Sequence, residues 1–323
     1  MSQAPEIVFG AFGIDTYSTE QFNEILDTLD KHNVKQIDTA RAYGTSEYVL
    51  QEFGAPRRFA ISTKAKGWAP GTMGKQGVLD SIKDSFRELQ VEQVDIFYLH
   101  APDPSTPIEE TLAAIQESYA AGKFKRFGIS NFRPAEVQRI YDIQAAAKSV
   151  LPSVFQGNYN AISRHTESDL FPLLHKLKMS FYAYSPIAGG FLVKDSKSIR
   201  EQTAGGRWGK DSPAEIGDSY AKMYTKDSLL DALDEWEVIA NDAGIPKASL
   251  ALRWLAYHSA LKAANGDAIV FGATKPSQVE ETCTYIKQGP LDDKIAERAT
   301  ALWKRIEKDA PLDMWNSHIA LKY

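Results

Sequence analysis

The amino-acid sequence predicts an α/β fold, a closed (β/α)8 barrel of the TIM type, and two repeated features support this prediction. Eight short apolar runs rich in β-branched or aromatic residues recur along the 323 residues, and most gaps between them carry apolar residues at helical spacing. Strands that alternate with helices form parallel sheets, since each helix carries the chain back to the start of the next strand. No GxGxxG motif follows an early strand, which favours a barrel over an open doubly wound sheet.

The expected elements follow one another in regular order. We expect strands at residues 7–12, 35–38, 59–63, 95–99, 126–130, 153–156, 180–184 and 268–272. Helical spacing covers residues 20–32, 78–89, 108–121, 134–147 and 167–177. In one of these segments Leu79, Ile82 and Phe86 lie three or four positions apart, so they share one helical face.

Two segments break this spacing, namely residues 185–224, rich in Gly, Ser and charge, and the tail after Lys308. Long loops in compact domains usually serve as lids or clasps, and we expect residues 185–224, here called the clasp, to be one. No repeat, low-complexity tract or linker divides the chain. Residues 1–323 therefore predict a single domain, which is the usual size of one barrel.

The composition indicates an ordinary globular protein that binds a small molecule. Hydrophobic residues make up 43% and charged residues 24%, which excludes disordered and collagen-like classes. The net charge of -5, with both signs interleaved, argues against nucleic acid or an anionic membrane as partner. The chain has no long apolar run and no signal-peptide pattern at its start. Cys283 is the only cysteine. We expect a cytoplasmic protein without disulfides.

Four polar residues stand at or just after the ends of successive expected strands: Asp38 and Tyr43, then Lys64, then His100. Each alone has a plain reading as a turn cap, a half-buried aromatic or a surface charge. Barrel active sites, however, form at this face. Reducing a carbonyl requires hydride at carbon and a proton at oxygen from an acid within hydrogen-bond reach. We expect Tyr43 to be that acid.

The other three residues have complementary expected roles. A free tyrosine titrates near 10, so a nearby cation must stabilise its phenolate, and Lys64 would supply that charge. Asp38 would pair with the ammonium and hold it in place. A neutral His100 would donate a hydrogen bond to the carbonyl oxygen and orient it. We expect no metal site, because the six histidines show no paired spacing with carboxylates.

An ordered series of segments carries a family resemblance along nearly the whole chain. It includes IDTARAYG, STKAKGW, YLHAPD, GKFKRFGISNF, VFQGNYNA, FYAYSPIAGG and GDAIVFGATKPSQVEET. The chain resembles the aldo-keto reductases, in particular the branch of aflatoxin-aldehyde and succinic-semialdehyde reductases. The resemblance implies NADPH-dependent reduction of aldehydes, and of some ketones, to alcohols, with the same four residues as catalytic tetrad. It also implies that the protein can form a homodimer, as known in this branch.

The resemblance further implies that NADPH lies extended across the barrel mouth, which accounts for the missing glycine fingerprint. Ser130, Asn131 and Gln156 would hold the nicotinamide carboxamide, and Tyr184 would stack on the ring. The remaining expected contacts are Ser185, Ile187 and Gly189 near the pyrophosphate, then Gly272, Thr274, Lys275, Gln278, Glu281 and Thr282 around the adenosine half, with Arg207 from the clasp.

Two cations, Lys275 and Arg207, are expected to neutralise a 2′-phosphate. Members of the family often have serine at the first position and asparagine where this chain has Thr282. One charge-assisted hydrogen bond contributes roughly 1.5 to 3 kcal/mol, about ten- to a hundred-fold in affinity. We therefore hypothesise that the protein prefers NADPH to NADH.

The substrate end suggests an aromatic pocket. Trp68 and Trp208 are expected to wall it beside Tyr43 and His100. Family members that prefer acidic aldehydes carry arginines around residues 223–228 and at the C-terminus, and this chain has none in either place. We expect neutral aromatic or reactive aldehydes to be preferred over carboxylated ones.

Two other functions remain open at this point. The first is a redox-sensing, regulatory subunit that binds NADPH with little turnover, as in channel β-subunits that resemble this family. The second is an aldolase that forms a Schiff base through Lys64, since barrels host that chemistry too. The presence of all four catalytic groups favours the reductase.

Overall fold

The computed structural model describes residues 3–209 and 214–319 of the chain. Its eight parallel strands form one closed sheet in chain order, in which β8 pairs back to β1. This confirms the predicted barrel. The strands are β1 Glu6–Gly10, β2 Gln36–Asp38, β3 Ala60–Lys64, β4 Val94–Leu99, β5 Phe124–Ser130, β6 Pro152–Asn158, β7 Ser180–Tyr184 and β8 Ala268–Phe271.

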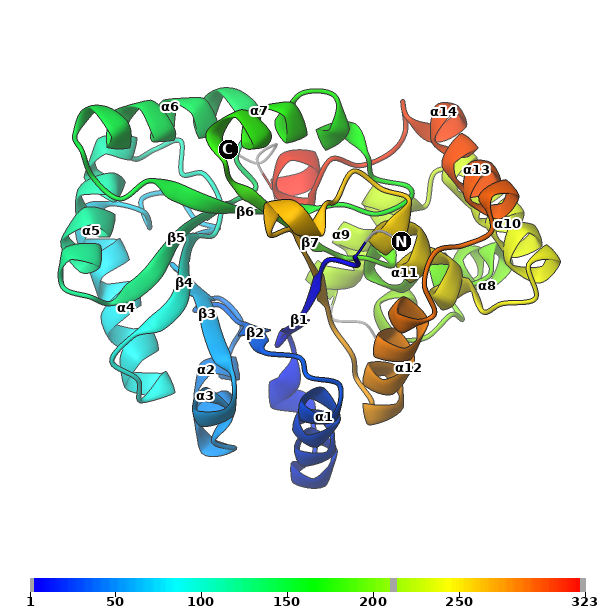
Figure 1. Cartoon of the computed structure of the whole chain (residues 1–323), viewed down its shortest axis with the longest axis horizontal. Helices are drawn as coiled ribbons and strands as arrows, with labels where there is room; N and C mark the ends of the chain where they lie inside the picture. Colours follow the sequence, from blue (N-terminus) through cyan, green and yellow to red (C-terminus); the bar gives the residue numbers. More distant parts are fainter. Residues whose placement is uncertain (1–2, 210–213, 320–323) are drawn as a thin grey trace.

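The helices form an outer layer around the strands (Figure 1). From α1 to α7 they are Thr19–Lys31, Ser46–Glu52, Ala55–Arg58, Lys75–Leu89, Ile108–Ala120, Pro134–Ala146 and Leu170–Leu177. From α8 to α14 they are Ser196–Arg200, Ala214–Tyr224, Asp227–Asp242, Lys247–Tyr257, Pro276–Lys287, Asp293–Ala301 and Trp303–Ile306. The first, α1, shows why such segments fold: Ser18 and Gln21 form a capping box, and Phe22, Ile25 and Leu29 are buried on one face.

The structure differs from the sequence-based expectation most clearly at the end of the first strand and in the clasp. Strand β1 ends at Gly10 instead of residue 12, which places Phe12 in the loop at the barrel mouth. The clasp is more helical than a plain loop, because it holds η3 (Ala188–Val193), α8, η4 (Gly206–Trp208) and α9. Residues 210–213 of the clasp and 320–323 of the tail lie outside the described residues.

The barrel interior is filled with side chains. Its apolar part comprises Val8, Ile96, Tyr98, Val154, Tyr182, Ala268 and Val270. Near the amino ends of the strands, Arg126 pairs with Asp95 at 2.6 Å and donates to the hydroxyl of Tyr182 at 3.2 Å. In barrels of this kind, active sites form at the opposite, carboxyl-terminal face.

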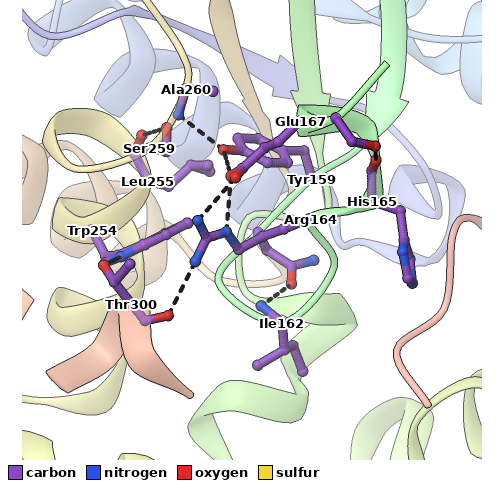
Figure 2. Close-up of polar contacts among 12 residues, drawn as sticks. Tyr159, Ile162, Arg164, His165, Glu167, Trp254, Leu255, Ser259, Ala260 and Thr300 are labelled. Carbon is purple, nitrogen blue, oxygen red and sulfur yellow. Dashed lines mark hydrogen bonds and ion pairs between the residues drawn. The ribbon is translucent and has the colours of Figure 1, made fainter. Parts of the chain in front are cut away.

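A half-buried ion pair ties the loop after β6 to the outer helices (Figure 2). Arg164 donates to both carboxylate oxygens of Glu167, at 2.8 and 2.9 Å, and to the carbonyl of Thr300 in α13 at 3.2 Å. Its guanidinium lies over the ring of Trp254 in α11, 5.1 Å from the centroid. Tyr159 donates to the same Glu167 at 2.5 Å. This cluster fixes the wall beside the barrel mouth.

Two findings bear on the expected partners. Within residues 3–209 and 214–319, none of the helices has the length and apolar character needed to cross a bilayer. Nor do the described His, Cys, Asp and Glu side chains gather in threes or more in a way that would hold a metal ion.

Candidate active site

The four candidate catalytic residues converge at the carboxyl ends of the strands. Asp38 is the last residue of β2 and Lys64 the last of β3, while His100 directly follows β4. Tyr43 lies in the loop after β2. Parallel pairing brings these strand ends to the same rim, which explains why residues far apart in the chain meet there.

Lys64 forms the buried centre of the group. Its side chain is 0% exposed, and its ammonium donates to Asp38 Oδ2 at 2.5 Å and to the carbonyl of Thr39 at 2.8 Å. Burial lowers the pKa of Lys64, while the negative charges of Asp38 and Glu47 oppose that change. The two carboxylates thus offset part of the effect of burial on this cation.

Tyr43 lies close to that cation and to two other rings. The Lys64 ammonium is 5.1 Å from the centroid of the Tyr43 ring. Phe12 meets the ring edge-on at 5.0 Å, and the His100 imidazole does so at 5.6 Å. Burial raises the pKa of Tyr43 well above 10, the charge of Asp38 raises it further, and Arg207 lowers it. Arg207 thus moderates the rise in this pKa without reversing it, and Tyr43 holds its proton at neutral pH.

His100 is held neutral. Burial, followed by the positive charge of Lys64, keeps its pKa well below the usual 6.5. Its Nδ1 is buried and has no hydrogen-bond partner within the described part of the chain. A neutral imidazole carries one N–H, so this ring can donate a hydrogen bond to a carbonyl oxygen without bringing a second positive charge.

The residues predicted to hold the nicotinamide gather at the ends of β5, β6 and β7. Asn131 donates to the carbonyl of His100 at 2.9 Å and to Ser130 at 3.1 Å, and it accepts from Tyr184 at 2.8 Å. Gln156 donates to the second oxygen of Asp38 at 2.9 Å. Sequence reasoning did not foresee this bond, which links the proposed cofactor end directly to the Lys64 and Asp38 pair.

The clasp is held together by an aromatic core. Trp208 is 6% exposed and packs against Phe191 and Tyr220, and its indole N–H donates to the carbonyl of Gly189 at 3.1 Å. A Cβ on Gly189 would lie 2.0 Å from the Tyr220 ring. The structure thus places Trp208 in the clasp core, with no ring contact to the tetrad, and packing explains why residue 189 is glycine.

Arg207 reaches from the clasp to the barrel mouth. It donates to the hydroxyl of Tyr220 at 3.0 Å, and its guanidinium lies 5.5 Å from the centroid of the Phe12 ring. Its charge lowers the pKa values of both Tyr17 and Tyr43. Tyr17 in turn donates to the carbonyl of Ala273, in the loop before α12, at 2.8 Å. The Arg207 charge therefore acts on Tyr43 in the tetrad and on a tyrosine bonded to that loop.

The predicted adenosine contacts surround the start of α12. Lys275 is exposed at the N-cap, and Gln278 accepts from the backbone N–H of Thr274 at 2.7 Å and of Lys275 at 3.2 Å. Gln278 therefore caps the helix in this structure. Further along α12, Glu281 is exposed and Thr282 half-buried. At the other predicted phosphate contacts, Ser185 and Ile187 are half-buried and Gly272 is exposed.

Three aromatic residues lie beside the tetrad, where the substrate pocket was predicted. Trp68 meets the His100 ring edge-on at 5.0 Å, and Trp315 from the C-terminal segment packs on Trp68 at 5.5 Å. Phe12, 41% exposed, lies on the other side of Tyr43. Sequence reasoning found Trp68 but missed Phe12 and Trp315. Phe12 could have been found from its place after the first strand, whereas nothing local marks Trp315.

The C-terminal segment is tied to the proposed nicotinamide site. Asn316 donates to the carbonyl of Asn131 at 3.0 Å and accepts from the guanidinium of Arg133 at 3.0 Å. Asp313 accepts from the backbone N–H of Asn316 at 2.6 Å and from its amide at 2.8 Å. Burial raises the pKa of Asp313 from 3.8 to about 6. The segment thus braces the loop that carries Asn131.

Comparisons with known proteins agree with this architecture. A family model described as "Aldo/keto reductase family" matches residues 6–304. Oxidoreductase sirO of Leptosphaeria maculans is 38% identical over 321 residues, covering 95% of this chain and 96% of that protein. An aldo-keto reductase of Pseudocercospora fijiensis is 36% identical over 88% of this chain and 97% of its own length. Aflatoxin B1 aldehyde reductase member 2 of Homo sapiens is 34% identical over 85% of this chain and 80% of its own length.

These relatives cover most of both chains, and the family model spans all eight strands. The predicted family resemblance is therefore confirmed. The chain belongs to the aldo/keto reductase family of oxidoreductases.

Proposed function

We propose that the protein reduces aldehydes to alcohols with NADPH, with Tyr43 as the proton donor. The observation that carries this proposal is the convergence of Tyr43, Lys64, Asp38 and His100 at one rim, with a buried cation 5.1 Å from the tyrosine ring. The relative named as an aflatoxin B1 aldehyde reductase supports an aldehyde as the reducible group.

The proton transfer follows from the protonation states. Tyr43 carries its proton at neutral pH because burial raises its pKa. As negative charge develops on the carbonyl oxygen, the phenol becomes the nearest acid, and donation leaves a phenolate. The Lys64 ammonium and the Arg207 guanidinium stabilise that phenolate, and Asp38 keeps the ammonium in place.

His100 acts on the carbonyl before the proton moves. Its neutral ring donates one hydrogen bond to the oxygen, which polarises the carbonyl and aligns it with Tyr43. Trp68 and Phe12 border the same space, so they limit the orientations that an aldehyde can take. Bound NADPH supplies the hydride that adds to the carbonyl carbon.

The residues present fit such a cofactor. Ser130, Asn131 and Gln156 place hydroxyl and amide groups together at the carboxyl-terminal parts of the adjacent strands β5 and β6, where a carboxamide needs both donors and acceptors. Tyr184 is half-buried beside them and is fixed by its bond to Asn131. His100 Nδ1 is buried at the same rim without a hydrogen-bond partner among the described residues, so a bound ligand can supply one. We propose that Lys275 and Arg207 meet the phosphates of the cofactor.

For the substrate, we propose neutral aromatic or reactive aldehydes. The rings of Phe12 and Trp68 contact Tyr43 and His100, and Trp315 packs on Trp68. Such an aromatic wall favours flat apolar groups. A higher kcat/KM for succinic semialdehyde than for para-nitrobenzaldehyde would contradict this preference.

The Schiff-base alternative conflicts with the geometry of Lys64. Its nitrogen is fully buried and donates to Asp38 and to Thr39, so a carbonyl reaches it only by displacing both partners. Borohydride in the presence of an aldehyde should therefore form no lysine adduct at position 64.

The test of the proposed function is NADPH oxidation with para-nitrobenzaldehyde by wild type, Tyr43→Phe and Tyr48→Phe. Tyr48 is a matched control because it is an exposed tyrosine on α2. We expect turnover by wild type and by Tyr48→Phe, and a loss of at least about a hundred-fold in Tyr43→Phe, the range for a general acid. Equal turnover in all three would remove Tyr43 from the mechanism. Tight NADPH binding without wild-type turnover would favour a redox-sensing subunit.

A further inference from the structure

The Lys64 ammonium has a second aromatic neighbour that the mechanism above does not use. Its nitrogen lies over the ring of Tyr98, 5.6 Å from the centroid, as well as over the ring of Tyr43. Asp38 and Thr39 accept two of the three ammonium N–H groups, and the described residues provide no third acceptor. The face of an aromatic ring carries partial negative charge and attracts a cation within about 6 Å.

The hydroxyl of Tyr98 does not explain why an aromatic side chain stands at this position. Tyr98 is 0% exposed, and its oxygen is buried without a hydrogen-bond partner among the described residues. An unpaired buried hydroxyl is unfavourable. The useful part of the side chain at this position is therefore the ring.

The neighbouring strand holds that ring in place. Tyr98 pairs with Gly128 across β4 and β5. A Cβ on Gly128 would lie 2.3 Å from Tyr98 Cδ1, so only glycine lets the ring come so close. Ile96 Cγ2 would lie 2.9 Å from the same Cβ and closes the space further. The ring thus has a fixed place beside Lys64.

We propose that Tyr98 is a positioning residue, whose ring face stabilises the Lys64 ammonium inside the barrel and keeps it ready for the Tyr43 phenolate. The catalytic part of this inference rests on the proposed function, but the effect on Lys64 does not require turnover. The other groups that act on Lys64 are the carboxylates of Asp38 and Glu47, the Tyr43 ring, and the neutral His100.

Two substitutions at position 98 separate the effect of the ring face on Lys64 from the effects of the ring's shape and of the hydroxyl. Tyr98→Phe keeps the ring and removes only the unpaired oxygen. Replacing Tyr98 by pentafluorophenylalanine keeps the shape of the ring but removes the negative character of its face. The Lys64 amine is titrated by NMR in ligand-free protein with isotope-labelled lysine, and Lys64→Met assigns its signal.

We expect the same Lys64 pKa in wild type and Tyr98→Phe. With the fluorinated ring we expect a fall of about one unit, a tenfold loss of proton affinity, because the ammonium loses a favourable partner while burial still opposes it. Equal Lys64 pKa values in the Tyr98→Phe and fluorinated proteins would overturn the inference. If the fluorinated protein does not fold, Tyr98→Leu replaces it, with the same expected and contradicting results.

The pH profile of kcat/KM then connects Lys64 to the reaction. The profile should fall at high pH as Lys64 loses its proton, and this limb should move about one unit lower with the fluorinated ring but not in Tyr98→Phe. A lowered Lys64 pKa in a protein whose wild type shows no turnover would refute the proposed function alone. Normal turnover with an unchanged Lys64 pKa in the fluorinated protein would refute the role of Tyr98 alone.

Discussion

Burial is the largest influence on the protonation of Tyr43, Lys64 and His100. It raises the pKa of the phenol and lowers the pKa values of the ammonium and the imidazole. Tyr43 and His100 are thereby kept neutral. Lys64 has the close carboxylate of Asp38 as its counterion. One charged pair beside two neutral donors is the state that proton donation to a carbonyl requires.

Asp313 provides a pH test of the same principle. Burial raises its pKa from 3.8 to about 6, so between these values the folded state binds more protons than the unfolded state. Stability should therefore fall as pH rises through this window, by about 3 kcal/mol in all. In Asp313→Asn this component is absent. In thermal unfolding from pH 4 to 7, the stability of Asp313→Asn should rise relative to that of wild type as pH rises. A difference in stability that stays constant over this range would contradict the raised pKa of Asp313.

At this scale the sequence predicted residue types better than their partners. Asp38, Tyr43, Lys64 and His100 could be found because each marks a strand end. The bond from Gln156 to Asp38 and the orphaned hydroxyl of Tyr98 could not, because both depend on which inward side chains meet across the barrel. Such contacts are set by strand register, which the sequence pattern does not specify.

At the scale of elements, the clasp depends on the close approach of the Gly189 backbone to the Tyr220 ring. Gly189 has a φ of 64°, and a Cβ there would meet the Tyr220 ring at 2.0 Å. Gly54, at the N-cap of α3, has nearly the same backbone, with a φ of 68° and a ψ of 17°, but no heavy atom lies within 4 Å of such a Cβ. An alanine would meet similar backbone strain at both positions, but it would clash with a neighbour only at Gly189.

These glycines form a matched pair for testing the clasp. Gly189→Ala should displace Tyr220 and with it Arg207, which is bonded to the Tyr220 hydroxyl. We expect NADPH to bind about tenfold more weakly, the loss for one charge-assisted bond, while Gly54→Ala stays near wild type. Fluorescence titration measures both. Equal affinities in the two variants would show that clasp packing does not govern cofactor binding.

The Arg164 cluster links the loop after β6 to α11 and α13 (Figure 2). Arg164→Met removes the partner of Glu167, which is 27% exposed, and leaves its charge unpaired. We expect a loss of about 2 to 3 kcal/mol in unfolding free energy by urea titration. Arg139→Met, which removes an exposed ion pair with Glu109, should change little. Equal losses would mean that burial of the Arg164 pair adds nothing.

For elements, the sequence predicted order and type but not every boundary. Eight strands were expected, and the described part of the chain contains eight. The clasp was expected as a loop, yet it contains short helices, because Trp208, Phe191 and Tyr220 give it a core of its own. Local periodicity over such short stretches is too weak to predict helices.

At the scale of the whole molecule, the chain distributes the proposed cofactor contacts over the barrel mouth. Tetrad residues come from β2 to β4, carboxamide contacts from β5 to β7, and adenosine contacts from the start of α12. A closed barrel alone brings these three sets to one face. The predicted family and barrel are both confirmed, and the cofactor path remains our proposal.

Lys275 tests that path at its far end. It is exposed at the N-cap of α12, free to meet a 2′-phosphate. Lys275→Ala should weaken NADPH binding about ten- to a hundred-fold and leave NADH binding unchanged. Lys83→Ala, an exposed lysine on α4, serves as the control. Unchanged NADPH affinity in Lys275→Ala would show that the phosphate lies elsewhere.

The proposed reaction is hydride transfer to an aldehyde with a proton from Tyr43. A single turnover of protein-bound NADPH with para-nitrobenzaldehyde, followed by the loss of NADPH absorbance, isolates this step. We expect wild type to consume its bound NADPH at least as fast as its steady-state turnover, and Tyr43→Phe to do so at least about a hundred-fold more slowly. Equal single-turnover rates in the two proteins would contradict it.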